Sequence, residues 1–199
     1  MTPESAQAGR QLIALLQLAH AGELAAALAY RGHWKSISNP SDRERIQTIE
    51  REELEHRAQI AGMLRELGES PRPFREARAW LVGRGLGLLC HVSGWVMPMY
   101  GAGKLESRNV REYEAAARYA WFSGRREWAD CFLTMAEVEW EHEAYFRANV
   151  LAHPLGRRLP IWPAPPPKEH IRSAFEREVT RDDAAEELHR AEYAPLKDC

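Results

Sequence analysis

The 199-residue sequence predicts an all-α protein, namely a four-helix bundle with a crossover helix and a proline-rich C-terminal extension. Apolar residues recur at intervals of three and four along four long stretches, which is the period of a helix with one buried face. Eight of the twelve prolines lie in two regions, 71–73 and 154–167, where they separate helices. Glu-x-x-His occurs on two of the helical stretches, so each places a carboxylate and an imidazole on one face.

Composition fits one globular domain with a tail, since 45% of residues are hydrophobic and 28% are charged. The net charge of −2 gives no overall attraction to nucleic acid, so nucleic acid is not an expected partner. Cys90, Cys131 and Cys199 form no zinc or disulfide motif, which favours a reducing, cytoplasmic location. No basic region precedes the first apolar run, and we expect no signal peptide.

The first predicted helix covers residues 4–37, and its apolar stripe is interrupted by His20 and Glu23 before it reaches Tyr30. A buried carboxylate costs several kcal/mol unless it is paired or binds a metal. Glu23 is therefore a candidate ligand. The alternative is that Glu23 lies at the edge of the stripe and reaches solvent.

Asn39-Pro40 ends this helix and caps the next, which we expect to run to Leu67. Glu53 and His56 lie on its apolar face, whereas the other charged residues, including Glu52, are expected on a solvated surface. The alternative for His56 is a histidine satisfied within the core.

The hydrophobic segment 80–100 follows, and residues 85–103 contain no Asp, Glu, Lys or Arg. Its length approaches that of a membrane span, but five glycines, His91 and Pro98 argue against a helix facing lipid. We expect a buried crossover helix that packs closely through its glycines. A surface that touches a membrane is the alternative.

Two further helices are predicted over residues 104–123 and 125–151. The first carries Glu106 on its apolar stripe, and the second carries Glu139 and His142. The bundle is thus expected to occupy residues 1–153.

A proline-rich polar extension is expected over residues 154–199. Its segment 159–167 is expected to be extended and to lie over the bundle through Ile161 and Trp162. The remainder is expected to form one or two short helices.

Together the four helices offer two lone glutamates and two Glu-x-x-His units. This is the ligand scheme of ferritin-like di-iron proteins. Four carboxylates balance two divalent ions, and two neutral imidazoles complete a site suited to iron, with manganese as an alternative in vitro. The other explanation is an acidic core without metal. The six candidate ligands are Glu23, Glu53, His56, Glu106, Glu139 and His142.

The chain also resembles the demethoxyubiquinone hydroxylase family over roughly residues 12–150. The resemblance is carried by His20-Ala-Gly-Glu23 with Tyr30, Glu53-Leu-Glu-His56, the glycine-rich segment 83–103, Glu106 with Tyr113, and Glu139-Trp-Glu-His142. It implies a ferritin-like fold, two irons held by the same six residues, and oxygen-dependent hydroxylation of a quinone precursor. The chain departs from the family pattern at Ala19, where the family has Asp, at Glu112, where it has His, and in the tail.

We therefore expect an oxygen-dependent di-iron monooxygenase that acts on an apolar, ring-containing, quinone-like molecule and needs an electron donor. Candidate residues around the metals or the substrate are His20, Tyr30, Tyr113, Gly94 and Trp95. The alternatives are a hydroxylase that modifies tRNA, a ferroxidase or peroxide-scavenging protein, and a helical interaction module without catalysis. Peripheral membrane contact and a homodimer are further expectations that the sequence leaves open.

Overall fold

A computed structural model describes residues 3–192 of the chain, with side chains through Arg181. This part is all-α and contains no β-strand, as predicted. Its helices are α1 (Pro3–Ser36), α2 (Pro40–Glu66), α3 (Pro73–Leu89), α4 (Val96–Phe122), α5 (Arg126–Ala152), the short 3₁₀ helix η1 (Gly156–Arg158) and α6 (Glu169–Glu192). The chain divides into two compact units, residues 1–165 and 166–199, and the second contains α6.

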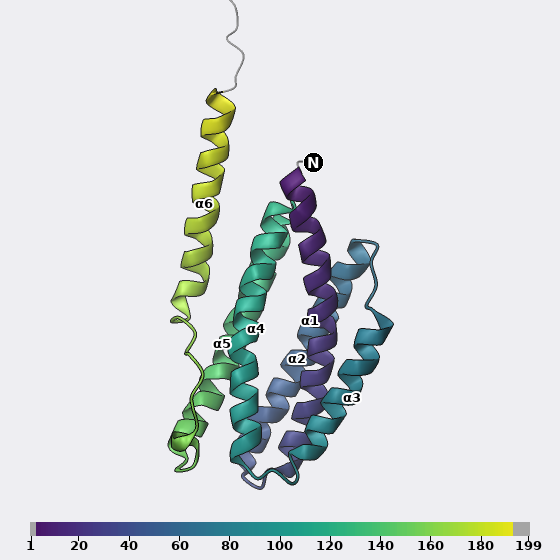
Figure 1. Ribbon diagram of the computed structural model, residues 1–199, viewed down its shortest axis with the longest axis vertical. Coiled ribbons are helices and arrows are strands. Elements are labelled where there is room, and N and C mark those ends of the chain that lie inside the picture. Colours follow the sequence, from purple (N-terminus) through teal and green to yellow (C-terminus); the bar gives the residue numbers. More distant parts are fainter. Residues whose placement is uncertain (1–2, 193–199) are drawn as a thin grey trace, which may run out of the picture. The chain divides into compact units, whose positions relative to one another are not determined.

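The first unit is a ferritin-like bundle of four long helices, in which α1 packs against α2 and α4 packs against α5. Helix α3 packs on the outer side of α1 (Figure 1). The start of α2 is fixed by Asn39, whose side chain accepts a hydrogen bond from the amide of Ser41 at 2.9 Å. Pro40 follows at a position where a helix needs no amide donor.

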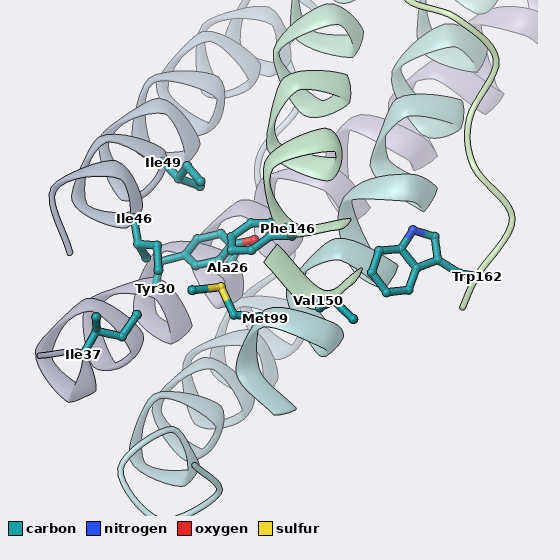
Figure 2. Packing of buried hydrophobic residues seen from close by; sticks show 9 residues of the cluster. All are labelled: Ala26, Tyr30, Ile37, Ile46, Ile49, Met99, Phe146, Val150 and Trp162. Carbon is teal, nitrogen blue, oxygen red and sulfur yellow. The ribbon is translucent and has the colours of Figure 1, made fainter. Parts of the chain in front are cut away.

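The end of the bundle near the α3–α4 connection is filled by aromatic and aliphatic side chains. The rings of Tyr30 and Phe146 stack with centroids 5.7 Å apart (Figure 2). Ile46 and Ile49 from α2 and Met99 from α4 complete this part of the core. Tyr30 therefore links the apolar core to the polar groups deeper in the bundle.

The glycine-rich segment does not form one helix, in contrast to the sequence expectation. Helix α3 ends at Leu89, and α4 begins at Val96, eight residues before the predicted start. Pro98 is compatible with α4 because it is the third residue of the first turn, where no amide bond is lost.

The glycines of α3 do pack closely, as expected. A Cβ atom on Gly83 would lie 2.5 Å from the carbonyl oxygen of Ala25, and one on Gly87 would lie 2.8 Å from that of Leu28. Helix α3 can therefore approach the backbone of α1 only because these two residues lack side chains.

The expectation that the crossover helix is buried was wrong. Its large apolar side chains point outward, and Leu88 is 73% exposed while Val92, in the following turn, is 79% exposed. The reason is that the face touching α1 is occupied by glycine, which leaves tryptophan and leucine on the opposite face. One described helix, α1, is long and apolar enough to cross a membrane, but half of its most apolar stretch is buried in the bundle.

The start of the proline-rich extension belongs to the first compact unit. Trp162 is buried and donates from Nε1 to Glu143 Oε1 at 2.7 Å, while Arg147 donates to the Trp162 carbonyl oxygen at 3.2 Å. Ile161 remains 38% exposed, so of the two predicted residues only Trp162 packs into the bundle. Tyr100 also donates to the Pro160 carbonyl oxygen at 2.6 Å, and Ser107 donates to that of Pro163 at 3.3 Å. Residues 193–199, which include Cys199, lie outside the described part of the chain.

Candidate metal centre

All six predicted ligand residues are buried and meet inside the bundle. One donor atom each from Glu53, Glu106, Glu139 and His142 lies within 4.8 Å of the others. Glu23 and His56 form a second group of this kind with Glu139. Glu139 belongs to both groups, so it could contact both ions if two were bound. Glu23 is only 4% exposed, which excludes the alternative that it reaches solvent.

Each histidine turns Nδ1 toward this cluster. Nδ1 of His142 lies 3.3 Å from Glu53 Oε1, and Nδ1 of His56 lies 3.1 Å from Glu139 Oε1, both without hydrogen-bond geometry. The other ring nitrogen of His142, Nε2, is 2.8 Å from Glu52 Oε2. This contact leaves Nδ1 free to bind a cation, as in a carboxylate–histidine–metal arrangement. Glu52 is therefore partly exposed, as expected for the charged surface, but it also contacts a residue of the cluster, which the sequence did not indicate.

Two tyrosines and one asparagine orient the outer carboxylates. The Tyr30 hydroxyl donates to Glu106 Oε1, and the Tyr113 hydroxyl donates to Glu23 Oε1. Asn109 Nδ2 donates to Glu106 Oε2 at 2.8 Å. Sequence reasoning missed Asn109 because it lies at the polar margin of its helix, although its position three residues after Glu106 placed it within reach.

Burial dominates the electrostatics of the cluster. It raises the pKa of Glu23 and raises those of Glu53 and Glu106 well above the ordinary value, and neighbouring carboxylates add to this effect. Burial also opposes ionisation of Glu139, but the imidazoles beside it outweigh burial and hold its pKa below the usual range. Burial lowers the pKa of His142, yet its acidic neighbours raise it to about 9.

Several polar atoms of the cluster have no hydrogen-bond partner. They are Glu23 Oε2, both carboxylate oxygens of Glu53, Glu139 Oε1, and Nδ1 of His56 and of His142. Leaving buried polar atoms unsatisfied costs about 1–3 kcal/mol for each group. Divalent cations would satisfy these oxygens and nitrogens together and would reduce the repulsion between carboxylates. The residues therefore fit a two-metal site with mixed oxygen and nitrogen ligands.

The other predicted site residues lie in different places. His20 Nδ1 is 2.8 Å from Glu76 Oε1, and Arg57 bonds both to Glu76 Oε2 at 2.7 Å and to the His20 carbonyl oxygen at 2.6 Å. His20 thus ties α1 to α2 and α3. Gly94 and Trp95 lie in the α3–α4 turn, and Gly94 has a φ of +74°. The centroid of the Trp95 ring lies 5.5 Å from that of the His153 ring.

Two cavities lie beside the carboxylate cluster, and neither is lined by Gly94 or Trp95. The first, of about 480 Å³, lies between α1, α3 and α4 and reaches Glu23 and Tyr113. Its lining includes Arg75 and Arg108, together with Glu112, which stands where the resembling family has His.

The second cavity, of about 410 Å³, is lined almost entirely by apolar atoms and reaches Tyr30. It lies between α1, the end of α3 and the start of α4. Leu86, Leu89, Met97 and Gly101 form much of its wall. Both volumes are in the range of small-molecule sites.

Comparison with protein families agrees with this geometry. The model of the family described as "Ubiquinone biosynthesis protein COQ7" matches residues 10–108. The match includes Glu23, Glu53, His56 and Glu106 and ends before α5, whose Glu139 and His142 complete the cluster in the structure. No curated protein and no solved structure matched the chain. The protein belongs to the COQ7 family of ferritin-like di-iron hydroxylases.

Proposed function

We propose that the protein is an oxygen-dependent monooxygenase that binds two iron ions and hydroxylates an apolar, quinone-like ring. The observation that carries this proposal is the buried group of four carboxylates and two imidazoles, six of whose donor atoms lack any other partner. Two irons, when bound, supply the redox chemistry that activates dioxygen. The electrons would come from a separate electron donor.

The protein residues have separable tasks in this proposal. Glu53, Glu106 and His142 would hold one ion, Glu23 and His56 would hold the other, and Glu139 belongs to both groups of donors. The Tyr30 hydroxyl donates to one oxygen of Glu106, and the Tyr113 hydroxyl donates to one oxygen of Glu23. Burial raises the pKa of both tyrosines well above the usual value, so they remain protonated donors at neutral pH.

The apolar cavity beside Tyr30 supports the substrate class. Its wall consists mainly of aliphatic side chains, and no Lys or Arg lines it. A nucleotide phosphate would find no cationic partner there, whereas a substituted ring would bury apolar surface. This lining favours a quinone-like substrate over a modified tRNA base.

The exposed apolar side of α3 supports a second proposal, that the protein binds peripherally to membranes. Leu86, Leu89 and Met97 are exposed and also line the apolar cavity. A lipid phase in contact with α3 would therefore meet the cavity entrance. An apolar substrate could pass from lipid to the site without crossing water.

The decisive test begins with anaerobic loading with ferrous iron, followed by exposure to oxygen. We expect about two irons per chain, from the ligand count of this class, and an absorption spectrum of oxo-bridged or carboxylate-bridged ferric iron. The double variant Glu53→Ala, Glu139→Ala should lose both. Full iron content in this variant would refute the site.

The substrate assay then separates the candidate reactions. With a chemical reductant that supplies two electrons per turnover, a short-chain benzoquinol that lacks one ring oxygen should gain one hydroxyl group. One molecule of oxygen should be consumed and one of water formed for each product. If iron and oxygen or peroxide alone account for all turnover, the protein is a ferroxidase or a peroxide scavenger.

A further inference from the structure

His33 is a buried histidine that lines the apolar cavity and has a ring nitrogen without a hydrogen-bond partner. It lies on α1 one turn after Tyr30, and its side chain contributes to the cavity wall. The residue is 2% exposed, and its ring stacks on Phe146 with centroids 6.3 Å apart. Nε2 of His33 has no hydrogen-bond partner. His33 is not one of the six residues of the metal cluster.

An unsatisfied buried nitrogen is uncommon because it loses its bonds to water without replacement. The cavity wall contains few groups that could form a hydrogen bond with this nitrogen. The Tyr30 hydroxyl is committed to Glu106, and Cys90 Sγ donates to the Leu86 carbonyl oxygen at 3.2 Å. Ser93 is the other polar residue of the wall. A molecule that fills the cavity could therefore gain a hydrogen bond with His33 that the protein leaves unmade.

The chemistry of His33 limits what that molecule can be. Burial lowers its pKa to about 4, so the imidazole is neutral at physiological pH. A neutral Nε2 can donate to a carbonyl or ether oxygen or accept from a hydroxyl group, depending on the tautomer. The apolar wall around it disfavours a charged ligand.

We propose that His33 is a specificity-determining residue whose Nε2 forms a hydrogen bond with an oxygen substituent of a neutral, apolar ring bound in this cavity. The inference rests on the proposed function and adds the group that selects and orients the substrate. His33 and Tyr30 are three residues apart, so they lie on the same face of α1, about 5–6 Å apart at Cβ. A ring held at His33 by one oxygen would therefore lie beside Tyr30, whose hydroxyl donates to Glu106.

The test compares two probes that differ only in their oxygens, namely tetramethyl-1,4-benzoquinone and 1,2,4,5-tetramethylbenzene. The quinone has no free ring position, so it does not add to cysteine thiols. Binding to the full chain carrying ferric iron is measured by quenching of tryptophan fluorescence and by calorimetry. His33→Phe keeps a ring against Phe146 but removes the nitrogen, and His33→Gln retains a hydrogen-bonding group. His91→Phe, at an exposed histidine, is the control.

We expect His33→Phe to weaken quinone binding about tenfold, which corresponds to about 1.4 kcal/mol, and to change hydrocarbon binding less than twofold. His33→Gln should retain most of the quinone affinity, and His91→Phe should match the unaltered protein. Gly101→Leu should abolish binding of both probes, because a Cβ at Gly101 meets no atom within 4 Å and the side chain would enter the cavity.

Three results would overturn the inference: an unchanged preference for the quinone in His33→Phe, an equal loss of both probes in that variant, or no binding of either probe to the unaltered protein. An equal loss would assign His33 to packing. Iron content is measured on the same samples. Normal iron content with an unchanged probe preference refutes the role of His33 alone, whereas failure of the unaltered protein to bind two irons refutes the proposed function.

Discussion

Replacing Glu52 with Gln should weaken metal binding, although Glu52 is not one of the six residues that face the metals. Its carboxylate lies 2.8 Å from Nε2 of His142. The substitution retains a hydrogen-bond acceptor but removes the negative charge. His142 should then be a weaker ligand, because a carboxylate partner fixes the tautomer and increases the basicity of the coordinating nitrogen.

The size of the effect follows from the electrostatics of His142. Its pKa rises from 6.5 to about 9 even though burial acts in the opposite direction. Glu139 and Glu52 both raise this pKa, and Glu139 is the stronger of the two. Loss of a carboxylate partner behind a metal-binding histidine typically lowers metal affinity about 10-fold to 100-fold, and we expect about tenfold for Glu52, whose side chain is 31% exposed.

The assay is competition for ferrous iron against a chelator of known affinity, without oxygen. Glu55→Gln is the matched control, because it makes the same change on an exposed face of the same helix. We expect the affinity of Glu52→Gln to fall about tenfold relative to this control, with the stoichiometry retained at saturating iron. Equal affinities in the two variants would show that the Glu52 contact does not act on the metal.

Three further predictions use stability, cavity volume and lipid binding. Removing the metal with a chelator should lower Tm, because bound metal stabilises the folded state; an unchanged Tm after verified metal removal would contradict this. In the metal-free protein, Tm should fall further between pH 7 and 9. The raised pKa of His142 stabilises the folded state fully below pH 6.5, and this contribution is lost as the pH passes through about 9, so a Tm that rises with pH would contradict the prediction. Gly101→Leu fills the apolar cavity beside Tyr30 and should block turnover while two irons still bind. Gly22→Leu extends into the other cavity, near Glu23, and should leave quinone turnover intact. The opposite pattern would place the substrate in the cavity near Glu23. In flotation with neutral phosphatidylcholine vesicles, the protein should rise with the lipid and a Leu81→Ser, Leu88→Ser variant should not; equal flotation would exclude this face as the contact.

The six residues of the cluster could be predicted from sequence because helical periodicity determines which residues share a face. Glu53 and His56 are three residues apart, as are Glu139 and His142, so each pair must point in one direction once its helix forms. A glutamate on an otherwise apolar stripe, such as Glu23, needs a partner in the core. These local rules were sufficient because every member of the cluster lies on a long, regular helix.

The surroundings of the cluster could not be predicted in the same way, since they depend on distances between helices. Glu52 lies one position away from the apolar face, and only the approach of α5 brings His142 to it. His33 is similar, because the sequence does not reveal that this residue lines a cavity. The glycines of α3 correctly indicated close packing, but they did not show on which side of the helix its leucines would lie.

Close packing of α3 and exposure of its apolar side chains have a common cause. Gly83 and Gly87 occupy the face in contact with α1, so the helix comes near enough to close one side of the apolar cavity but can bury few of its large side chains. An exposed apolar surface of this kind is uncommon in a protein that has no partner for it. Here the exposed residues Leu86 and Leu89 also line the cavity beside Tyr30. The same packing that closes the cavity therefore places its entrance on an apolar surface, where a lipid-soluble ring would be concentrated.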